Sequence, residues 1–385
     1  MRDPEVHGHF RKPIANAFAL STLMEYQPVV DSTLNSLFTI LDRESTKGED
    51  IDVAKWVFYY AFDLIGNLSF GKPIGFLEQG KDMYDLIRKQ LIMTDYVRLL
   101  MVMPVLHYFL LGNPILGLFI DPSKNAFHRF SKERVRERIN EADSHHSIFG
   151  GSGRSPRKPD LLTYFLDSRE KYPEIMTEEQ VISTTIVNVF AGALATSTLY
   201  LAVHHLATIP ASQERLYNDM KELGVSTPVT WQETQKLPFL NGVIRESTRL
   251  HLALNSMLGR DVPREGLILP NGVRLPHGVA VGVKPHCSAA QERNFGPEPL
   301  TFKPERWCIY ENETTEEYEA RKAKMELADL SFGYGTRACI GQNIARLQMF
   351  KVIANLVWRY ELIPAEEVGS ARKREVFCRL KPRKH

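Results

Sequence analysis

The sequence predicts a mainly α-helical fold with one small β region. Apolar residues recur at helical spacing through most of the chain, as Ile14 and Phe18 do near its start. Residues 259–283 differ, because apolar residues alternate with others there, as at Val279 and Val281, and glycine-containing turns separate the runs. Alternation is typical of strands, so we expect a small sheet in this stretch.

The expected helices lie between recognisable start and stop signals. Thr177 and Gln180 have the spacing of a capping box before a long apolar helix, and Pro73 follows the end of an earlier one. Residues 144–159, rich in Ser and Gly, should form a flexible loop, and residues 302–329 an irregular charged segment. The expected helices cover residues 5–43, 52–68, 122–142, 178–205, 210–223, 240–251 and 340–360.

Composition favours one globular unit over residues 1–385. The chain is 43% hydrophobic and 24% charged, and neither a repeat nor a long linker divides it. Its net charge of +2 and the lack of a basic face argue against a nucleic-acid partner. The 4 cysteines lie far apart, at 287, 308, 339 and 378, which argues against a zinc site or a disulfide framework.

Residues 99–120 form the most apolar stretch of the chain. The stretch is long enough to span a bilayer, but Pro104, His107 and Pro114 interrupt it. Two readings stay open: a monotopic surface that dips into the membrane interface, or a pair of helices that are buried or line a substrate channel. A membrane span is the least favoured reading.

The segment from Phe332 to Gly341 reads Phe-Gly-Tyr-Gly-Thr-Arg-Ala-Cys-Ile-Gly. Cys339 stands at the entrance of an expected helix, where backbone N–H groups and the positive helix end favour a thiolate. Gly333 and Gly341 let the backbone pass close to a flat cofactor, and Arg337 can reach an anionic group on it. A lone cysteine is usually a small core residue, but here a whole pattern, F-x-x-G-x-R-x-C-x-G, agrees with a thiolate ligand.

This segment resembles the haem-binding loop of the cytochrome P450 family. The resemblance implies that the Cys339 thiolate is the axial ligand of the haem iron, that Arg337 contacts a propionate and that Phe332 packs beside the thiolate. It implies the family's fold, with haem b between a distal helix and the Cys339 loop. The implied activity is a monooxygenase that uses O2 and NADPH-derived electrons, delivered by a flavoprotein reductase.

Two further motifs agree with this resemblance in type and order. Glu246 and Arg249 stand three apart on an expected helix, so that they can pair, as in the family's E-x-x-R motif. Arg306, in the run Pro-Glu-Arg-Trp, resembles the family's arginine that joins this pair in a buried charge network. The resemblance implies a structural network that holds the loop presenting Cys339.

Three more basic residues resemble the family's propionate contacts. His7 and Arg11 stand four apart on an expected helix, with His in place of the usual Trp. Arg260 opens a strand after the E-x-x-R helix, where the family often places an arginine near the haem. For each of the three, a solvated surface side chain is the alternative.

The distal helix departs from the family's A-G-x-acid-T-T pattern. Ala191 and the next glycine match it, but Leu194 stands at the acid position and Ala195 at the first threonine position, so that only Thr196 is kept. In the family, acid and alcohol relay protons, and such chemistry needs groups within hydrogen-bond reach. Thr196 is the candidate relay residue. A non-oxygenating haem-thiolate reaction (rearrangement or dehydration) and an inactive haem-binding remnant are the alternatives.

The resemblance covers nearly the whole chain. A eukaryotic member usually begins further upstream, so we expect the N-terminal anchor and the first strands of the main sheet to be missing. Family members lie at the endoplasmic reticulum membrane; without an anchor, the expectation is its cytosolic face or the cytoplasm. Residues 62–66 and 237–241 resemble fungal secondary-metabolism members, which favours a small lipophilic substrate. The expected pocket residues are Phe190, Leu194, Leu254, Ser256 and Met257.

Overall fold

The computed structural model describes residues 4–103, 105–110, 113, 126–149, 160–192, 194, 196–252, 255–257, 259–366 and 375–384, and only the backbone of residues 4, 142–149, 196 and 197. Helices dominate this part of the chain and the sheets are small, which confirms the predicted fold class. The α-helices are α1 (Pro4–Arg11), α2 (Leu20–Glu25), α3 (Gln27–Ser45), α4 (Val53–Phe70), α5 (Phe76–Gln79), α6 (Leu86–Val102), α7 (Leu106–Phe109), α9 (Ala126–Phe149), α10 (Leu161–Lys171), α11 (Glu178–Gly192), α12 (Thr196–Thr208), α13 (Pro210–Leu223), α14 (Trp231–Thr234), α15 (Pro238–Leu250), α16 (Pro285–Ala289), α17 (Glu292–Phe295), α18 (Thr315–Ala328) and α19 (Gln342–Arg359).

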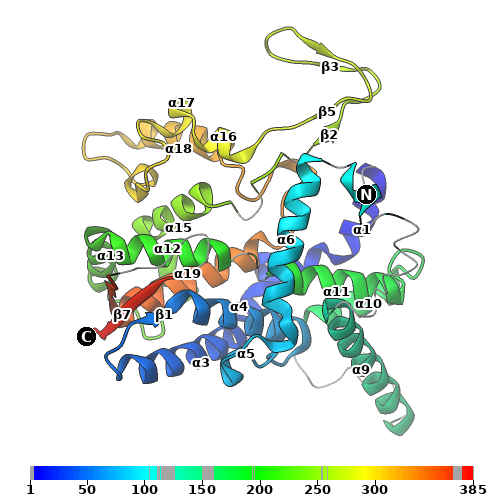
Figure 1. Ribbon diagram of the computed structural model, residues 1–385, viewed down its shortest axis with the longest axis horizontal. Helices are drawn as coiled ribbons and strands as arrows, with labels where there is room; N and C mark the ends of the chain where they lie inside the picture. Colours follow the sequence, from blue (N-terminus) through cyan, green and yellow to red (C-terminus); the bar gives the residue numbers. More distant parts are fainter. Residues whose placement is uncertain are drawn as a thin grey trace.

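Helices α4 and α19 form the centre of the molecule. Nearly every residue of α4 is buried, and it packs against α3, α11 and α12, while α19 packs against α12, α13 and α15 (Figure 1). The α4 sequence is apolar on most sides, as a helix enclosed by others requires. The Asp52 side chain accepts from the N–H of Lys55 at the start of α4, and Gly71 ends the helix in the left-handed region.

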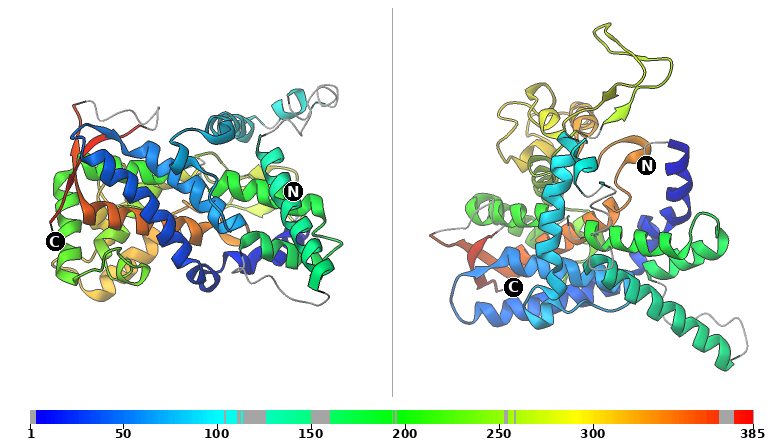
Figure 2. Two further views of the ribbon diagram at one scale, coloured as in Figure 1. Left: turned by 90° about the horizontal axis from the view of Figure 1, so that it is seen from below. Right: turned by 45° about the vertical axis from the view of Figure 1, so that its right-hand side comes forward.

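A three-stranded antiparallel sheet joins distant parts of the chain at one end of the molecule. Its order is β1 (Ile51–Asp52), β7 (Phe377–Pro382) and β6 (Tyr360–Pro364), with Leu362 opposite Leu380. The sheet lies at the far end of the molecule from α1, so the two ends of the chain are well apart (Figures 1 and 2). This sheet was not among the expectations from the sequence.

Residues 259–283 form the predicted β region as two separate ribbons. Strands β2 (Arg260–Asp261) and β5 (Ala280–Val281) pair, as do β3 (Leu267–Ile268) and β4 (Arg274–Leu275). The β3–β4 ribbon extends away from the helical body (Figures 1 and 2). Four apolar side chains of this region are exposed: Ile268, Val273, Val279 and Val283.

Three expectations about local structure were wrong. Residues 144–149 belong to α9 rather than to a loop, and residues 150–159 lie outside the described residues. Within residues 302–329, helix α18 replaces much of the irregular segment, because Thr314 and Glu317 form a reciprocal capping box at its start. The long helix expected over 178–205 is two helices, since α11 ends at Gly192 and α12 begins at Thr196.

The described part of residues 99–120 consists of the end of α6, the short helix α7 and their surroundings. Large apolar side chains are exposed there: Leu99, Val102, Met103, Val105, Tyr108, Phe109 and Leu110. Residues 104, 111, 112 and 114–120 lie outside the described residues. None of the described helices is long and apolar enough to cross a membrane.

Candidate functional site

The loop that carries Cys339 is closed by its own backbone. It leads from α18 to α19, and the N–H of Cys339 donates to the carbonyl of Phe332 at 2.8 Å. Gly333 and Gly335 have φ angles of 71° and 69°, in the left-handed region that side chains disfavour. The two glycines therefore permit the sharp turn that returns the chain to Phe332.

Cys339 lies just before helix α19, as the sequence predicts. Gly341 is the N-cap of that helix, and its N–H donates to the Cys339 sulfur. Desolvation nevertheless raises the pKa of the thiol, although the Gly341 N–H and the charge of Arg11 act in the opposite direction. The N–H contribution expected at the helix start is therefore present, but desolvation outweighs it in the cofactor-free chain. A bound metal ion would supply the missing stabilisation, because coordination deprotonates a thiol outright.

Four predicted basic residues gather beside this loop. Partial burial lowers the pKa of His7, and the positive charges of Arg337, Arg11 and Arg260 lower it further. Arg11 also donates from Nη1 to the carbonyl of Ala338 at 2.7 Å, which ties α1 to the loop. Residues from α1, β2 and the Cys339 loop thus converge, although more than 250 positions separate His7 from Arg260 in the sequence. Like charges repel, so the cluster favours an anionic partner.

Phe332 connects the loop to helix α19. Its side chain is partly buried and packs against the main core, and the guanidinium of Arg346 lies 5.7 Å from the centre of its ring. Burial lowers the pKa of Arg346, and the charge of Arg245 adds to this effect. The packing fixes the ring at the start of the Cys339 turn.

The break between α11 and α12 coincides with the departure from the family pattern. Ala191 is exposed, whereas Gly192 packs so closely on α4 that a Cβ there would lie 2.7 Å from Ile65 Cδ1. Leu194 is partly buried between the two helices. The structure describes only the backbone of Thr196, so its candidate role as a proton relay stays a prediction.

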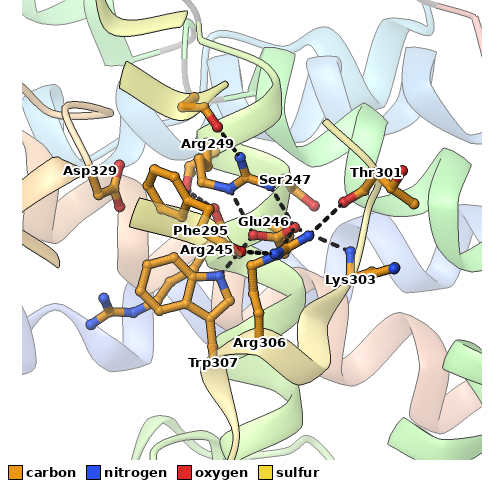
Figure 3. A network of polar contacts seen from close by, with 12 residues as sticks. Arg245, Glu246, Ser247, Arg249, Phe295, Thr301, Lys303, Arg306, Trp307 and Asp329 are labelled. Atoms are coloured by element: carbon orange, nitrogen blue, oxygen red, sulfur yellow. Dashed lines mark hydrogen bonds and ion pairs between the residues drawn. The ribbon is translucent and has the colours of Figure 1, made fainter. Parts of the chain in front are cut away.

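Glu246 is the centre of a fully buried network (Figure 3). Its Oε1 accepts from Arg249 Nε at 2.8 Å and from Trp307 Nε1 at 2.9 Å. Its Oε2 accepts from Arg249 Nη2 at 2.8 Å, from Arg306 Nε at 3.1 Å and from the backbone N–H of Lys303 at 3.1 Å. Two guanidinium groups thus share one carboxylate, as the two motifs predict.

The remaining N–H groups of these arginines bond to backbone carbonyls. Arg249 Nη1 donates to Ala289 at 2.7 Å, and Arg306 donates to Phe295, Glu298 and Thr301. The network therefore joins α15 to the loops around α16, α17 and the 3-10 turn η5 (Pro304–Trp307). A buried charge tolerates this environment only when its polar atoms are satisfied in this way.

Gly242 allows η5 to approach helix α15. A Cβ at this position would lie 2.4 Å from the carbonyl oxygen of Pro304. Neither this contact nor the Trp307–Glu246 hydrogen bond was predicted from the sequence. The indole N–H of Trp307, next to Arg306 in the motif, indicates a donor that needs a partner when buried.

Among the described residues, no pocket or side-chain contact brings the expected pocket residues together. Phe190 packs edge-on against Phe127 with ring centres 5.7 Å apart, and its carbonyl accepts from Gln90 Nε2 at 2.6 Å. Ser256 is buried, Met257 is exposed, and Leu254 lies outside the described residues. Their role in substrate binding stays a prediction.

Comparison with known proteins decides the family. The family model of cytochrome P450 matches residues 1–384. The chain belongs to the cytochrome P450 family. It is 31% identical to the cytochrome P450 monooxygenase cfoH of Aspergillus candidus over 391 aligned positions, 29% to cicH of Emericella nidulans over 371, and 27% to vrtE of Penicillium aethiopicum over 354. These alignments cover 99%, 95% and 91% of this chain and 70%, 71% and 65% of the relatives.

Membership makes the protein an oxidoreductase of the monooxygenase type, and the family implies haem iron, electrons from a reductase and lipophilic substrates. The residues present fit haem on three counts. Cys339 is a free cysteine at a helix start, the preceding glycines permit the sharp turn of its loop, and four basic side chains stand beside it. Such a set suits a flat iron cofactor with two carboxylates.

Proposed function

We propose that the chain is one haem domain over residues 1–385 that inserts one oxygen atom from O2 into a small lipophilic molecule. The fungal relatives favour secondary-metabolite biosynthesis as its setting. The observation that carries the proposal is the convergence of Cys339 with four basic residues from three separate segments. Electrons would come from NADPH through a flavoprotein reductase.

The basic cluster is the proposed anchor for the cofactor. His7, Arg11, Arg260 and Arg337 would hold the two propionates of haem b, because charge-assisted hydrogen bonds to carboxylates are among the strongest in proteins. When bound, haem b supplies the iron that activates O2. The Cys339 thiolate would hold the iron.

The residues around Cys339 have proposed roles that follow from their contacts. The Gly341 N–H would moderate the electron density on the sulfur, and Phe332 would shield it. Exposed Ala191, with its small side chain, would let the cofactor approach helix α11.

Proton delivery is the open step of the proposed reaction. Leu194 and Ala195 carry no group that can donate or accept a proton, so Thr196 is the proposed relay residue. The same two residues favour a second candidate function, a haem-thiolate rearrangement or dehydration that needs no such relay.

Isotopically labelled O2 separates the two functions. The haem-loaded protein, a fungal reductase and NADPH are incubated with a panel of lipophilic polyketides and terpenes, and products are analysed by mass spectrometry. One labelled oxygen atom in the product supports the monooxygenase. A converted substrate without label supports the second function and contradicts the first. The Leu194→Asp/Ala195→Thr variant should raise product formed per NADPH in the first case only.

We propose that the exposed apolar surface of α6 and α7 lies on the cytosolic face of the endoplasmic reticulum membrane. Val102, Val105, Tyr108 and Phe109 are 64–74% exposed there, and apolar side chains of this kind insert into the lipid interface. Replacing Val105 and Phe109 by Ser should abolish cosedimentation with phospholipid vesicles. The control is Leu327→Ser, since Leu327 is 67% exposed on α18; equal loss in both variants would contradict the assignment.

A further inference from the structure

Two side chains of helix α18 donate hydrogen bonds to three successive carbonyl groups, those of residues 306–308. These residues include the end of the Pro-Glu-Arg-Trp run. Arg321 donates to the carbonyl of Arg306, and its Nη2 donates to the carbonyl of Cys308 at 2.8 Å. The hydroxyl of Tyr318 donates to the carbonyl of Trp307 at 2.9 Å. Arg306 and Trp307 are the two side chains of this run that bond to Glu246. The contacts of α18 therefore fix the backbone of residues 306–308, which carries two of the side chains that bond to Glu246.

Arg321 is fixed in this position by other partners. Glu313 accepts from its Nε and its Nη2, both at 2.6 Å, and the ring of Tyr310 lies 4.2 Å from the guanidinium carbon. The hydrogen bond from Arg321 lowers the pKa of Glu313, so this carboxylate stays charged at neutral pH. A planar guanidinium with five N–H donors can serve two carbonyls and one carboxylate at once, which an ammonium group cannot do with the same geometry.

The other end of α18 is tied to the same network. Arg245 pairs with Glu326 at 2.8 Å and lies over the Trp307 ring at 4.8 Å. Met325 is buried in a small cluster with Phe295 and Trp307. Trp307 therefore contacts α18 at two points, Tyr318 and Met325.

The last residue of α18 lies close to the Cys339 loop in the chain. Only residues 329–331 separate Ala328 from Phe332, whose carbonyl accepts from the N–H of Cys339. The hydroxyl of Ser288 donates to the carbonyl of Ala328 at 2.7 Å, which fixes the point where the loop begins. Asp329 accepts from the N–H of Ser331 at 3.0 Å and stiffens the short connection.

We infer that Arg321 and Tyr318 are positioning residues for the loop that presents Cys339. They connect the Glu246 network to the start of this loop through α18, and their hydrogen bonds described above go to groups of the protein. The inference rests on the proposed haem ligation by Cys339 only for its spectroscopic test. The mechanical link from α18 to the loop is a property of the chain itself.

The test compares Arg321→Lys, Tyr318→Phe and the control Lys324→Gln, an exposed charge change on the same helix. In the haem-loaded full chain, the red-shifted Soret band of the reduced carbon-monoxide complex reports the thiolate ligand. Arg321→Lys should lose this band roughly tenfold faster at a fixed warm temperature. Losing one charge-assisted hydrogen bond should raise the population of the opened Cys339 loop by about a factor of ten, and the band is lost from that opened state. Tyr318→Phe should show a smaller acceleration, and Lys324→Gln none.

A second readout needs no cofactor. Hydrogen–deuterium exchange of residues 330–341 in the cofactor-free chain should accelerate in Arg321→Lys and not in Lys324→Gln. The reason is that the hydrogen bond from the Cys339 N–H to the Phe332 carbonyl would open more often in Arg321→Lys. Unchanged exchange and an unchanged band lifetime in both Arg321→Lys and Tyr318→Phe would overturn the inference. It would also be overturned if band loss followed global unfolding measured by circular dichroism. A parent chain without the thiolate band would count against the proposed ligation instead, and the exchange data would then decide the inference.

Discussion

Replacing Glu246 by Gln tests the buried network with the smallest possible change in shape. The carboxylate accepts five hydrogen bonds, three of them at Oε2, from Arg249, Arg306 and the N–H of Lys303. With the amide nitrogen at the Oε2 position, a donor faces these three donors, and two guanidinium groups lose their counter-charge. A flipped amide would impose the same conflict on Arg249 and Trp307.

The expected loss of stability follows from burial. Glu246 and Arg249 are 0% and 1% exposed, so water cannot replace the lost partner. Removing one member of a buried ion pair costs about 3–5 kcal/mol, and we expect Glu246→Gln to lower the free energy of unfolding by about 4 kcal/mol. Globular proteins have about 5–15 kcal/mol in total, so the variant should fold but unfold at much lower urea concentration.

Urea unfolding followed by circular dichroism measures this loss. The matched control is Glu326→Gln, which makes the same chemical change in a surface pair with Arg245, where the Glu326 side chain is 42% exposed. Surface pairs contribute at most about 1 kcal/mol. A loss below about 1 kcal/mol for Glu246→Gln, or equal losses in the two variants, would show that the buried carboxylate charge does not stabilise the network.

Three further predictions concern packing, capping and pH. Gly242→Ala should destabilise the fold by about 1–3 kcal/mol, because the new Cβ would lie 2.4 Å from the Pro304 carbonyl oxygen; an unchanged urea midpoint would contradict this. Asp63→Asn should cost about 2 kcal/mol, since Asp63 accepts from the three N–H groups of residues 75–77, and proteolysis near residue 75 should reveal local opening. Burial and two neighbouring histidines lower the pKa of His205 to about 4. As pH falls, His205 is therefore protonated at a higher pH in the unfolded chain than in the folded chain. Stability should therefore drop by about 2–3 kcal/mol between roughly pH 6.5 and 4, and His205→Phe should remove most of that drop in urea titrations at both pH values.

The parts of the site that were predictable are those whose signal is local. The segment around Cys339, the Glu246–Arg249 spacing and Arg306 each depend on residues within a few positions of one another. Each occupies the place that its motif implies. The basic cluster needed more than local spacing, because His7 and Arg260 come together only in the folded chain.

The parts that were not predictable depend on tertiary contacts. Helix α18 has few apolar residues, and its place is set by the contacts of Arg321 and Met325 rather than by an apolar stripe. The terminal sheet pairs Ile51 with Cys378, a partner more than three hundred positions away that no local pattern reveals. The pKa of Cys339 is decided by desolvation, which a sequence does not show.

The central claim is that Cys339 ligates haem iron, and a reduced carbon-monoxide difference spectrum of the purified, haem-loaded chain tests it most directly. The parent protein should show the red-shifted Soret band of thiolate-ligated ferrous haem. Cys339→Ala should lose this band, while Cys308→Ala, at the buried C-cap of η5, should keep it. A parent protein that binds haem without this band, or a band that persists in Cys339→Ala, would contradict ligation by Cys339.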